Sequence, residues 1–144
     1  MKLFKRDKEK RNKPPEGRRR RTWGIRKETL SLILEVSKES YPKEFAATLI
    51  AKKGIIEEIN LLPGTLSGST SAILRTHMQP PDIMLSVVGI VHSHPSRNFS
   101  PSGADLHFFS KFGNTHIIVG MPYDIRSWQA YDAFGKTIEL EIVE

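Results

Sequence analysis

The chain has 144 residues, which is enough for one domain with a sizeable hydrophobic core. It contains no cysteine, which excludes disulfides, zinc ribbons, iron–sulfur clusters and thiol nucleophiles and favours an intracellular setting. The net charge of +6 is unevenly distributed, because residues 1–22 hold 11 of the 22 lysines and arginines but only 3 of the 16 acidic residues. Residues 1–22 therefore carry a net charge of +8, and residues 23–144 carry −2.

The N-terminal segment, residues 1–22, is predicted to be a disordered basic tail. It contains Pro14, Pro15 and Gly17 and almost no apolar side chains, so burial could not offset the entropy lost on ordering. Its four consecutive arginines, 18–21, would suit a nucleic acid or an acidic partner, although a solvated extension is the simpler interpretation. The segment lacks the apolar stretch of a secretory signal, and no apolar run approaches the roughly 20 residues that span a bilayer. We therefore expect a cytoplasmic protein without a membrane partner.

Residues 23–144 are predicted to form a single compact α/β domain with a mixed β-sheet flanked by helices. Periodic apolar residues predict a helix over 25–40, which ends before Pro42, and a second helix over 102–112. Short apolar runs bounded by glycine and proline predict strands over 44–51, 55–62, 71–76 and 84–91, and three closing strands within 115–121, 124–132 and 135–144. This order of helices and strands indicates an α/β sheet with helices on its faces.

Two histidines stand two residues apart at the end of the apolar run 84–91. Side chains alternate along a strand, so His92 and His94 would share one face and could converge on one metal ion. Pro95 would end the strand here and leave the ring nitrogens accessible. Asp105 would lie one turn into the following helix and could point back as a third ligand. Three ligands of nitrogen and oxygen type plus a water are typical of a catalytic zinc site.

Each part of this pattern also has an interpretation without function. Ser102 and Asp105 suit the start of a helix, with serine as the N-cap and the acid in the first turn, where the helix dipole favours negative charge. The two histidines could be partly exposed polar residues of a strand end. The combination is harder to explain in this way, because the histidine pair is followed by a serine-led helix with an inward acid. We therefore favour a metal site.

The run HSHPSRNFSPSGAD, residues 92–105, resembles the signature of the JAMM (MPN-plus) zinc metalloproteases. It contains His-x-His-Pro followed by Ser and Asp at positions 102 and 105, with no departure in spacing. The run YPKEF at 41–45 and the closing PYD, W and Y between 122 and 131 also look like the small archaeal members. The resemblance covers about residues 25–144 and implies an MPN/JAB-like fold, which has a cytidine-deaminase-like architecture.

The resemblance implies one zinc ion per chain, held by His92, His94 and Asp105 with a position left for water. It also implies that Glu44 is the general base and later the general acid, a role that suits a carboxylate near the metal but outside its coordination shell. Ser102 would stabilise the oxyanion of the tetrahedral intermediate through its hydroxyl, and this role is compatible with that of an N-cap.

The other candidates are weaker. Glu57 and Glu58 are alternatives for the base, but they lie in mid-strand and do not match the family's position. His107 would face away from Asp105 around the helix, His116 would be structural, and His77 has no support for a role in the site.

The activity implied by the resemblance is hydrolysis of an isopeptide or peptide bond after the C-terminal glycine of a ubiquitin-like modifier or sulfur-carrier protein. Conjugates of such proteins would be the substrates. Two alternatives stay open: a non-catalytic MPN scaffold, although such relatives usually lack the zinc ligands, and a nucleic-acid-associated protein that acts through the basic tail. Bound zinc would argue against the scaffold. Salt-dependent nucleic-acid binding that is lost with the tail would favour the second alternative.

Overall fold

The computed structural model describes residues 21–61 and 86–144. Three predicted features lie partly or wholly outside this part: residues 1–20 of the tail, the strand expected at 71–76, and the ends nearest to it of the strands expected at 55–62 and 84–91. The described elements follow one another as β1 (Gly24–Arg26), α2 (Lys27–Ser40), β2 (Ala46–Lys52), β3 (Ile55–Leu61), β4 (Val87–Ser93), α5 (Gly103–Phe112), β5 (His116–Val119), β6 (Trp128–Tyr131), β7 (Thr137–Ile138) and β8 (Glu141–Val143). None of these helices has the length and apolar character needed to cross a membrane.

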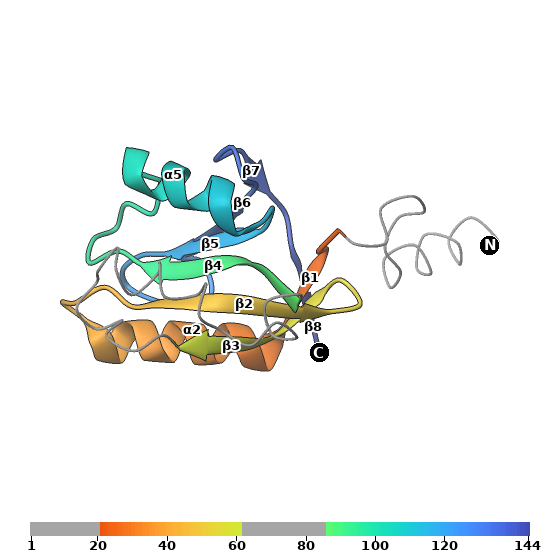
Figure 1. The fold of residues 1–144 in the computed structure, drawn as a ribbon. Helices are drawn as coiled ribbons and strands as arrows, with labels where there is room; N and C mark the ends of the chain where they lie inside the picture. Colours follow the sequence, from red (N-terminus) through yellow and green to blue (C-terminus); the bar gives the residue numbers. More distant parts are fainter. Residues whose placement is uncertain (1–20, 62–85) are drawn as a thin grey trace, which may run out of the picture.

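The strands of the described part form one mixed sheet in the order β7-β6-β5-β4-β2-β3-β1-β8. β4 runs parallel to β5, and β1 runs parallel to both β3 and β8, whereas the other neighbouring strands are antiparallel. Figure 1 shows α2 against one face of the sheet and α5 against the other. The predicted fold class, an α/β domain with a mixed sheet flanked by helices, is therefore confirmed.

Two segments of the chain differ from the expectation. Residues 24–26 form β1 between β3 and β8 instead of the first turn of a helix, and Ile25 is fully buried there. Burial between two strands outweighs the helical spacing of this residue. The closing run 135–144 divides into β7 and β8, which lie at opposite edges of the sheet. A hydrogen bond of 2.9 Å from the Arg26 guanidinium to Glu144 O helps to hold the end of β8 beside β1.

Two hydrophobic clusters, one on each face of the sheet, hold the layers together. The larger lies on the α2 side and contains Ile25, Leu30, Ile33, Leu34, Phe45, Ala47, Leu49, Ile56, Val91, Ile117, Val119, Tyr123 and Ala130. The smaller lies under α5 and contains Ile90, Phe108, Phe109, Phe112, Ile118 and Tyr131, with Phe99 packed against it. Along β4, Ile90 therefore faces α5 and Val91 faces α2, and this alternation sets the direction of the side chains that follow.

Candidate metal centre

The two histidines of the motif lie on the α5 side of the sheet. Ile90 packs under α5, and side chains alternate along a strand, so His92 and His94 point to the same side. His92 is 5% exposed, and His94, one residue beyond the end of β4, is partly exposed. The His94 N–H donates a hydrogen bond of 2.7 Å to Val119 O, which extends the pairing of β4 with β5 past the strand end. His94 therefore keeps the orientation of a strand residue.

Asp105 is placed by the start of α5. Ser102 is the N-cap of this helix: its hydroxyl accepts a hydrogen bond of 3.1 Å from the Asp105 N–H, and Asp105 Oδ2 accepts one of 2.8 Å from the Ser102 N–H. This reciprocal arrangement is a capping box. It fixes the side chain of Asp105 at the first turn, so the expected helix-start interpretation of these two residues is confirmed. The same hydrogen bonds help to orient the carboxylate toward the histidines.

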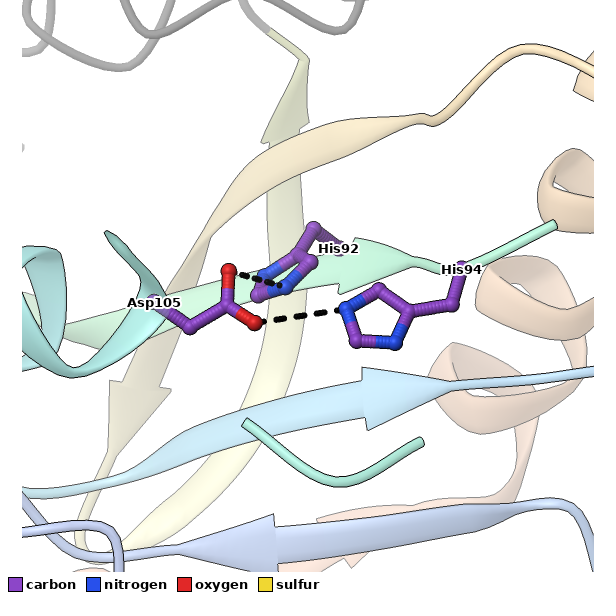
Figure 2. Close-up of side chains that lie close together, drawn as sticks. All are labelled: His92, His94 and Asp105. Carbon is purple, nitrogen blue, oxygen red and sulfur yellow. Dashed lines mark ion pairs between the residues drawn. The ribbon is translucent and has the colours of Figure 1, made fainter. Parts of the chain in front are cut away.

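The three side chains converge in front of β4 (Figure 2). His92 Nε2 lies 3.0 Å from Asp105 Oδ1, and His94 Nε2 lies 3.3 Å from Asp105 Oδ2. Each residue offers one ligand atom, and these atoms all lie within 4.8 Å of one another. Two imidazole nitrogens and one carboxylate oxygen at this spacing form a donor set that suits a metal ion such as zinc.

The hydrogen bonds around the imidazoles fit a cation at this place. His94 Nδ1 lies 2.8 Å from Asn98 O, a carbonyl that can only accept, so Nδ1 carries the hydrogen. In the neutral ring, Nε2 then presents a lone pair to the Asp105 carboxylate. The ring of His92 is buried, yet neither of its nitrogens makes a hydrogen bond of regular geometry among the described residues, and Nε2 has only the 3.0 Å contact with Asp105 Oδ1. A lone pair that faces a carboxylate oxygen is repulsive unless a cation or a proton lies between them.

The charges of the group follow from the same contacts. Burial acts to raise the pKa of Asp105, but the two imidazoles and the Ser102 N–H outweigh burial and hold the pKa of this carboxyl well below its usual range. The Asp105 carboxylate in turn raises the pKa of His94, against the opposite effect of burial. The Asp105 carboxyl is therefore ionised at neutral pH and offers a negatively charged ligand for a metal ion.

Glu44 lies in the same cleft as the three side chains. β2 runs antiparallel to β4 with Ala46 opposite His92, so the side chain two residues earlier returns to the same face, near His94. The cleft has a volume of about 380 Å³. It is lined by all five residues that the sequence singled out, Glu44, His92, His94, Ser102 and Asp105, together with apolar neighbours. The structure thus brings these residues together around one space.

The alternative base candidates do not share this position. Glu57 and Glu58 lie on β3 and are not among the residues that line the cleft. Glu58 is exposed, and the Glu57 carbonyl accepts a hydrogen bond from Thr29 of α2. His107 is exposed on α5 and stands outside the group of potential ligands. His77 lies outside the described residues.

His116 is a structural histidine, as its position at the start of a strand suggested. Its ring is fully buried and stacks on Phe109 with the ring centroids 4.2 Å apart. Nδ1 accepts a hydrogen bond of 3.1 Å from the Ile90 N–H, and Nε2 donates one of 2.8 Å to Gly113 O. Burial lowers the pKa of His116 to about 4, so the ring is neutral at pH 7 with both nitrogens in use.

Three residues that brace the site were not identified from the sequence. Asn98 holds His94 through a backbone carbonyl, and Tyr123 donates a hydrogen bond of 3.0 Å from its hydroxyl to His94 O. Ser93 accepts a hydrogen bond of 2.9 Å from the Phe45 N–H. Tyr123 belongs to the PYD run and Ser93 stands between the histidines, but neither position indicates a contact. A backbone carbonyl carries no signal in the sequence.

Known proteins to which this chain is similar belong to the JAB and JAMM groups or are named as metalloproteases. Residues 26–131 match the family described as prokaryotic homologues of the JAB domain. A Haloferax volcanii protein named as a probable metalloprotease is 33% identical over 137 residues, with 88% of this chain and 83% of the relative covered. A solved JAB1/MPN domain protein from Archaeoglobus fulgidus is 39% identical with a TM-score of 0.68, covering 84% of this chain and 99% of its own. A structure described as a metalloprotease-like JAMM zinc site in the proteasome and signalosome is 38% identical with a TM-score of 0.68, covering 85% and 99%.

Proposed function

The chain belongs to the prokaryotic homologues of the JAB domain, and we propose that it is a zinc-dependent protease of the JAMM type. The observation that carries this proposal is the convergence of His92, His94 and Asp105 in one cleft with Glu44. A metal-assisted hydrolytic site needs a cation-binding group and a proton acceptor beside it. The metalloprotease names of the relatives support the same class of reaction.

His92, His94 and Asp105 would hold the zinc ion through their ring nitrogens and carboxylate. A zinc ion with three protein ligands supplies a Lewis acid and lowers the pKa of a water in the remaining position to about 7. The hydrogen bond from His94 Nδ1 to Asn98 O keeps the Nε2 lone pair directed into the cleft. The Ser102 N–H orients the Asp105 carboxylate in the same way. These outer contacts orient the ligand atoms in advance.

Glu44 would accept the proton of the attacking water and later deliver a proton to the leaving amine. Its side chain lines the cleft but is not one of the three clustered ligands, so its carboxylate is available for proton transfer. In this reaction the water oxygen attacks the carbonyl carbon of the scissile bond, the carbon–nitrogen bond breaks, and the amine leaves with the proton from Glu44.

Ser102 would donate a hydrogen bond to the oxyanion that forms on the scissile carbonyl. A hydroxyl has one hydrogen and two lone pairs. Because the Asp105 N–H uses only a lone pair of the Ser102 oxygen, the hydroxyl hydrogen remains available. Ser102 is exposed at the edge of the cleft, where a substrate carbonyl could reach it. The capping and oxyanion roles are therefore compatible.

The proposed substrates are ubiquitin-like or sulfur-carrier proteins joined through a C-terminal glycine to a lysine amine or to a short peptide. The resemblance to the JAMM family is the main support for this choice.

A cleavage assay tests this function. A panel of ubiquitin-like and sulfur-carrier proteins, each fused through its C-terminal glycine to a second protein, would be incubated with the zinc-loaded chain. We expect cleavage after the glycine of at least one fusion, loss of cleavage with a chelator, and recovery when zinc is added back. Glu44→Gln is the matched control, because it should bind zinc but not cleave. A folded, zinc-bound wild-type protein that leaves every fusion intact would count against ubiquitin-like and sulfur-carrier proteins as its substrates.

A further inference from the structure

A serine between the two metal-facing histidines connects the ligand strand to the segment that carries Glu44. Ser93 is the last residue of β4 and is 1% exposed. Its hydroxyl accepts a hydrogen bond of 2.9 Å from the Phe45 N–H, and its own N–H donates one of 2.9 Å to Phe45 O. These two hydrogen bonds join β4 to the residue before β2, just beyond the last paired residues, Ala46 and His92.

The bond to the hydroxyl differs from the regular pattern of a sheet. In an antiparallel pair that continued past Ala46, the Phe45 N–H would donate to the carbonyl of Ser93. Here the side chain of Ser93 serves as the acceptor. Phe45 is fully buried, so water would not readily replace a lost acceptor, and an unpaired buried N–H is unfavourable. The hydroxyl therefore has a function that a residue without one could not fill.

This hydrogen bond fixes the peptide group that carries Glu44. The Phe45 N–H belongs to the planar peptide unit that also contains the carbonyl and Cα of Glu44. Glu44 lies two residues before Ala46, the first residue of β2, and the intervening Phe45 has its side chain in the cluster on the α2 side. The direction in which the Glu44 side chain leaves the backbone therefore depends on the acceptor that holds the Phe45 N–H.

We propose that Ser93 is a positioning residue that sets Glu44 against the metal ligands, an inference that rests on the proposed function. The backbone of Ser93 carries His92 and His94 on either side, while its side chain holds the base segment. One residue thus fixes both partners of the reaction in a common frame. Catalytic groups have to be held within about 0.5 Å of their productive geometry, and Ser93 achieves this from the face of the sheet opposite the cleft.

The central test is a double-mutant cycle in the full chain. Ser93→Ala should lower kcat by about 10- to 100-fold with little change in KM, because a misplacement of the order of 1 Å has effects of this size. In a Glu44→Gln background the same change should have almost no effect on kcat, since the base is already absent. The isosteric pair Ser93→Thr and Ser93→Val adds a second comparison: threonine keeps the hydroxyl and should retain the rate, and valine should behave like alanine.

Two further measurements do not depend on turnover. Hydrogen exchange of the Phe45 amide should be faster in Ser93→Ala and Ser93→Val and close to wild type in Ser93→Thr, while zinc affinity should be unchanged in all three. Thr29→Val is the matched control, because it also removes a buried hydroxyl that bonds to the backbone of another element, Glu57 O at 2.7 Å on β3. It should lower the stability but leave kcat and the exchange at Phe45 unchanged.

Three outcomes would overturn the proposal. Equal losses of kcat from Ser93→Ala with and without Glu44 would show an effect that does not pass through the base. A loss of zinc affinity as large as the loss of rate would assign Ser93 to the metal site alone. Wild-type activity in the Glu44→Gln single variant would remove the base assignment of the proposed function itself, and this failure is recognised without any change at Ser93.

Discussion

Two buried histidines lie on the same side of the sheet and differ in almost every contact. His116 is fully buried, stacks on Phe109 and uses both ring nitrogens in hydrogen bonds. His92 is 5% exposed and its ring centroid lies 6.3 Å from the same Phe109, yet its Nδ1 has no hydrogen-bond partner among the described residues and its Nε2 has only the 3.0 Å contact with Asp105 Oδ1. Buried polar atoms are normally paired, so an unpaired one requires an explanation. The difference indicates that burial alone does not separate a structural histidine from a ligand, whereas the hydrogen bonds do.

The surroundings of the two rings differ in the same sense. Around His116 the backbone segments touch: a Cβ on Gly89 would lie only 1.6 Å from Thr115 O, and the Thr115 N–H donates to Val88 O at 3.1 Å. Around His92 the sheet opens into the cleft that holds Glu44 and Asp105. The end of this face around His116, the packed end, is therefore rigid, and the end around His92, the open end, holds the candidate metal ligands and base. Changes at the open end should affect rate and metal binding, and changes at the packed end should affect stability.

Glu44→Gln should produce the largest effect at the open end. Glutamine keeps the size and most of the hydrogen-bonding capacity of Glu44 but cannot accept a proton at neutral pH. General-base catalysis contributes about 100- to 10,000-fold, so kcat should fall by this factor, as measured on the fusion that wild type cleaves best. Zinc content and thermal stability should match wild type. Cleavage at the wild-type rate would show that Glu44 is not the base.

His92→Gln and His116→Gln compare the two ends directly. Loss of an outer contact of a metal ligand typically weakens binding about 10- to 100-fold, so loss of the ligand itself should exceed about 100-fold in zinc affinity. His116→Gln should leave the affinity unchanged but lower the free energy of unfolding, because the stacking on Phe109 is lost. Competition with a chromophoric chelator and urea unfolding would measure the two quantities. Equal zinc affinities in both variants would remove the distinction between the histidines.

Ser102 should show both kinds of effect, because it caps α5 and also lines the cleft. Loss of one oxyanion donor typically slows turnover about 100- to 1,000-fold, so Ser102→Ala and Ser102→Gly should both lose kcat to this extent. Stability should separate them, since replacing an N-cap serine by alanine costs about 1 kcal/mol and by glycine only a few tenths. A rate that follows stability across the two variants would leave Ser102 with the capping role alone.

The metal group was predictable because its signals are local. His92 and His94 follow a buried apolar run, and Ser102 and Asp105 obey the rules for a helix start, so alternation along one strand and one helical turn were enough to place them. Glu44 was different. Only the family resemblance separated it from Glu57 and Glu58, since all three lie close to or within apolar strands. The structure separates them through the register of β2 with β4, which sequence patterns do not contain.

The sequence missed β1 and predicted β7 and β8 as one strand, because these elements are short and depend on distant partners. β1 and β8 have three residues each and pair in parallel across almost the whole chain. Three residues are too few to establish a period of two, and Ile25 also fits the helical pattern that follows it. The contact of Ser93 with Phe45 was not predicted for a similar reason, because it requires the exact register of two strands that are far apart in the sequence. Local sequence patterns therefore predicted the metal ligands, but they did not predict which distant strands pair.

The smallest expected effect comes from the titration of His116. Its pKa in the folded chain is about 4, below the value of about 6.5 in an unfolded chain, so the unfolded state takes up a proton first as the pH falls. The resulting stability is fully present above about pH 6.5 and is lost progressively toward pH 4. In metal-free protein, prepared with a chelator, the free energy of unfolding should fall by about 2 kcal/mol between pH 7 and pH 5 through this residue. Urea unfolding at the two pH values would measure this loss.

The difference between wild type and His116→Gln isolates this contribution, because the other titrating groups are common to both proteins. The gap in unfolding free energy between them should narrow by about 2 kcal/mol from pH 7 to pH 5. NMR can also follow the His116 ring directly in the folded, metal-free wild type. The ring should stay neutral with the hydrogen on Nε2 until the pH approaches 4. A ring that titrates near its ordinary value would mean that the packed end admits a charge, and the comparison with His92 would then have to rest on metal binding alone.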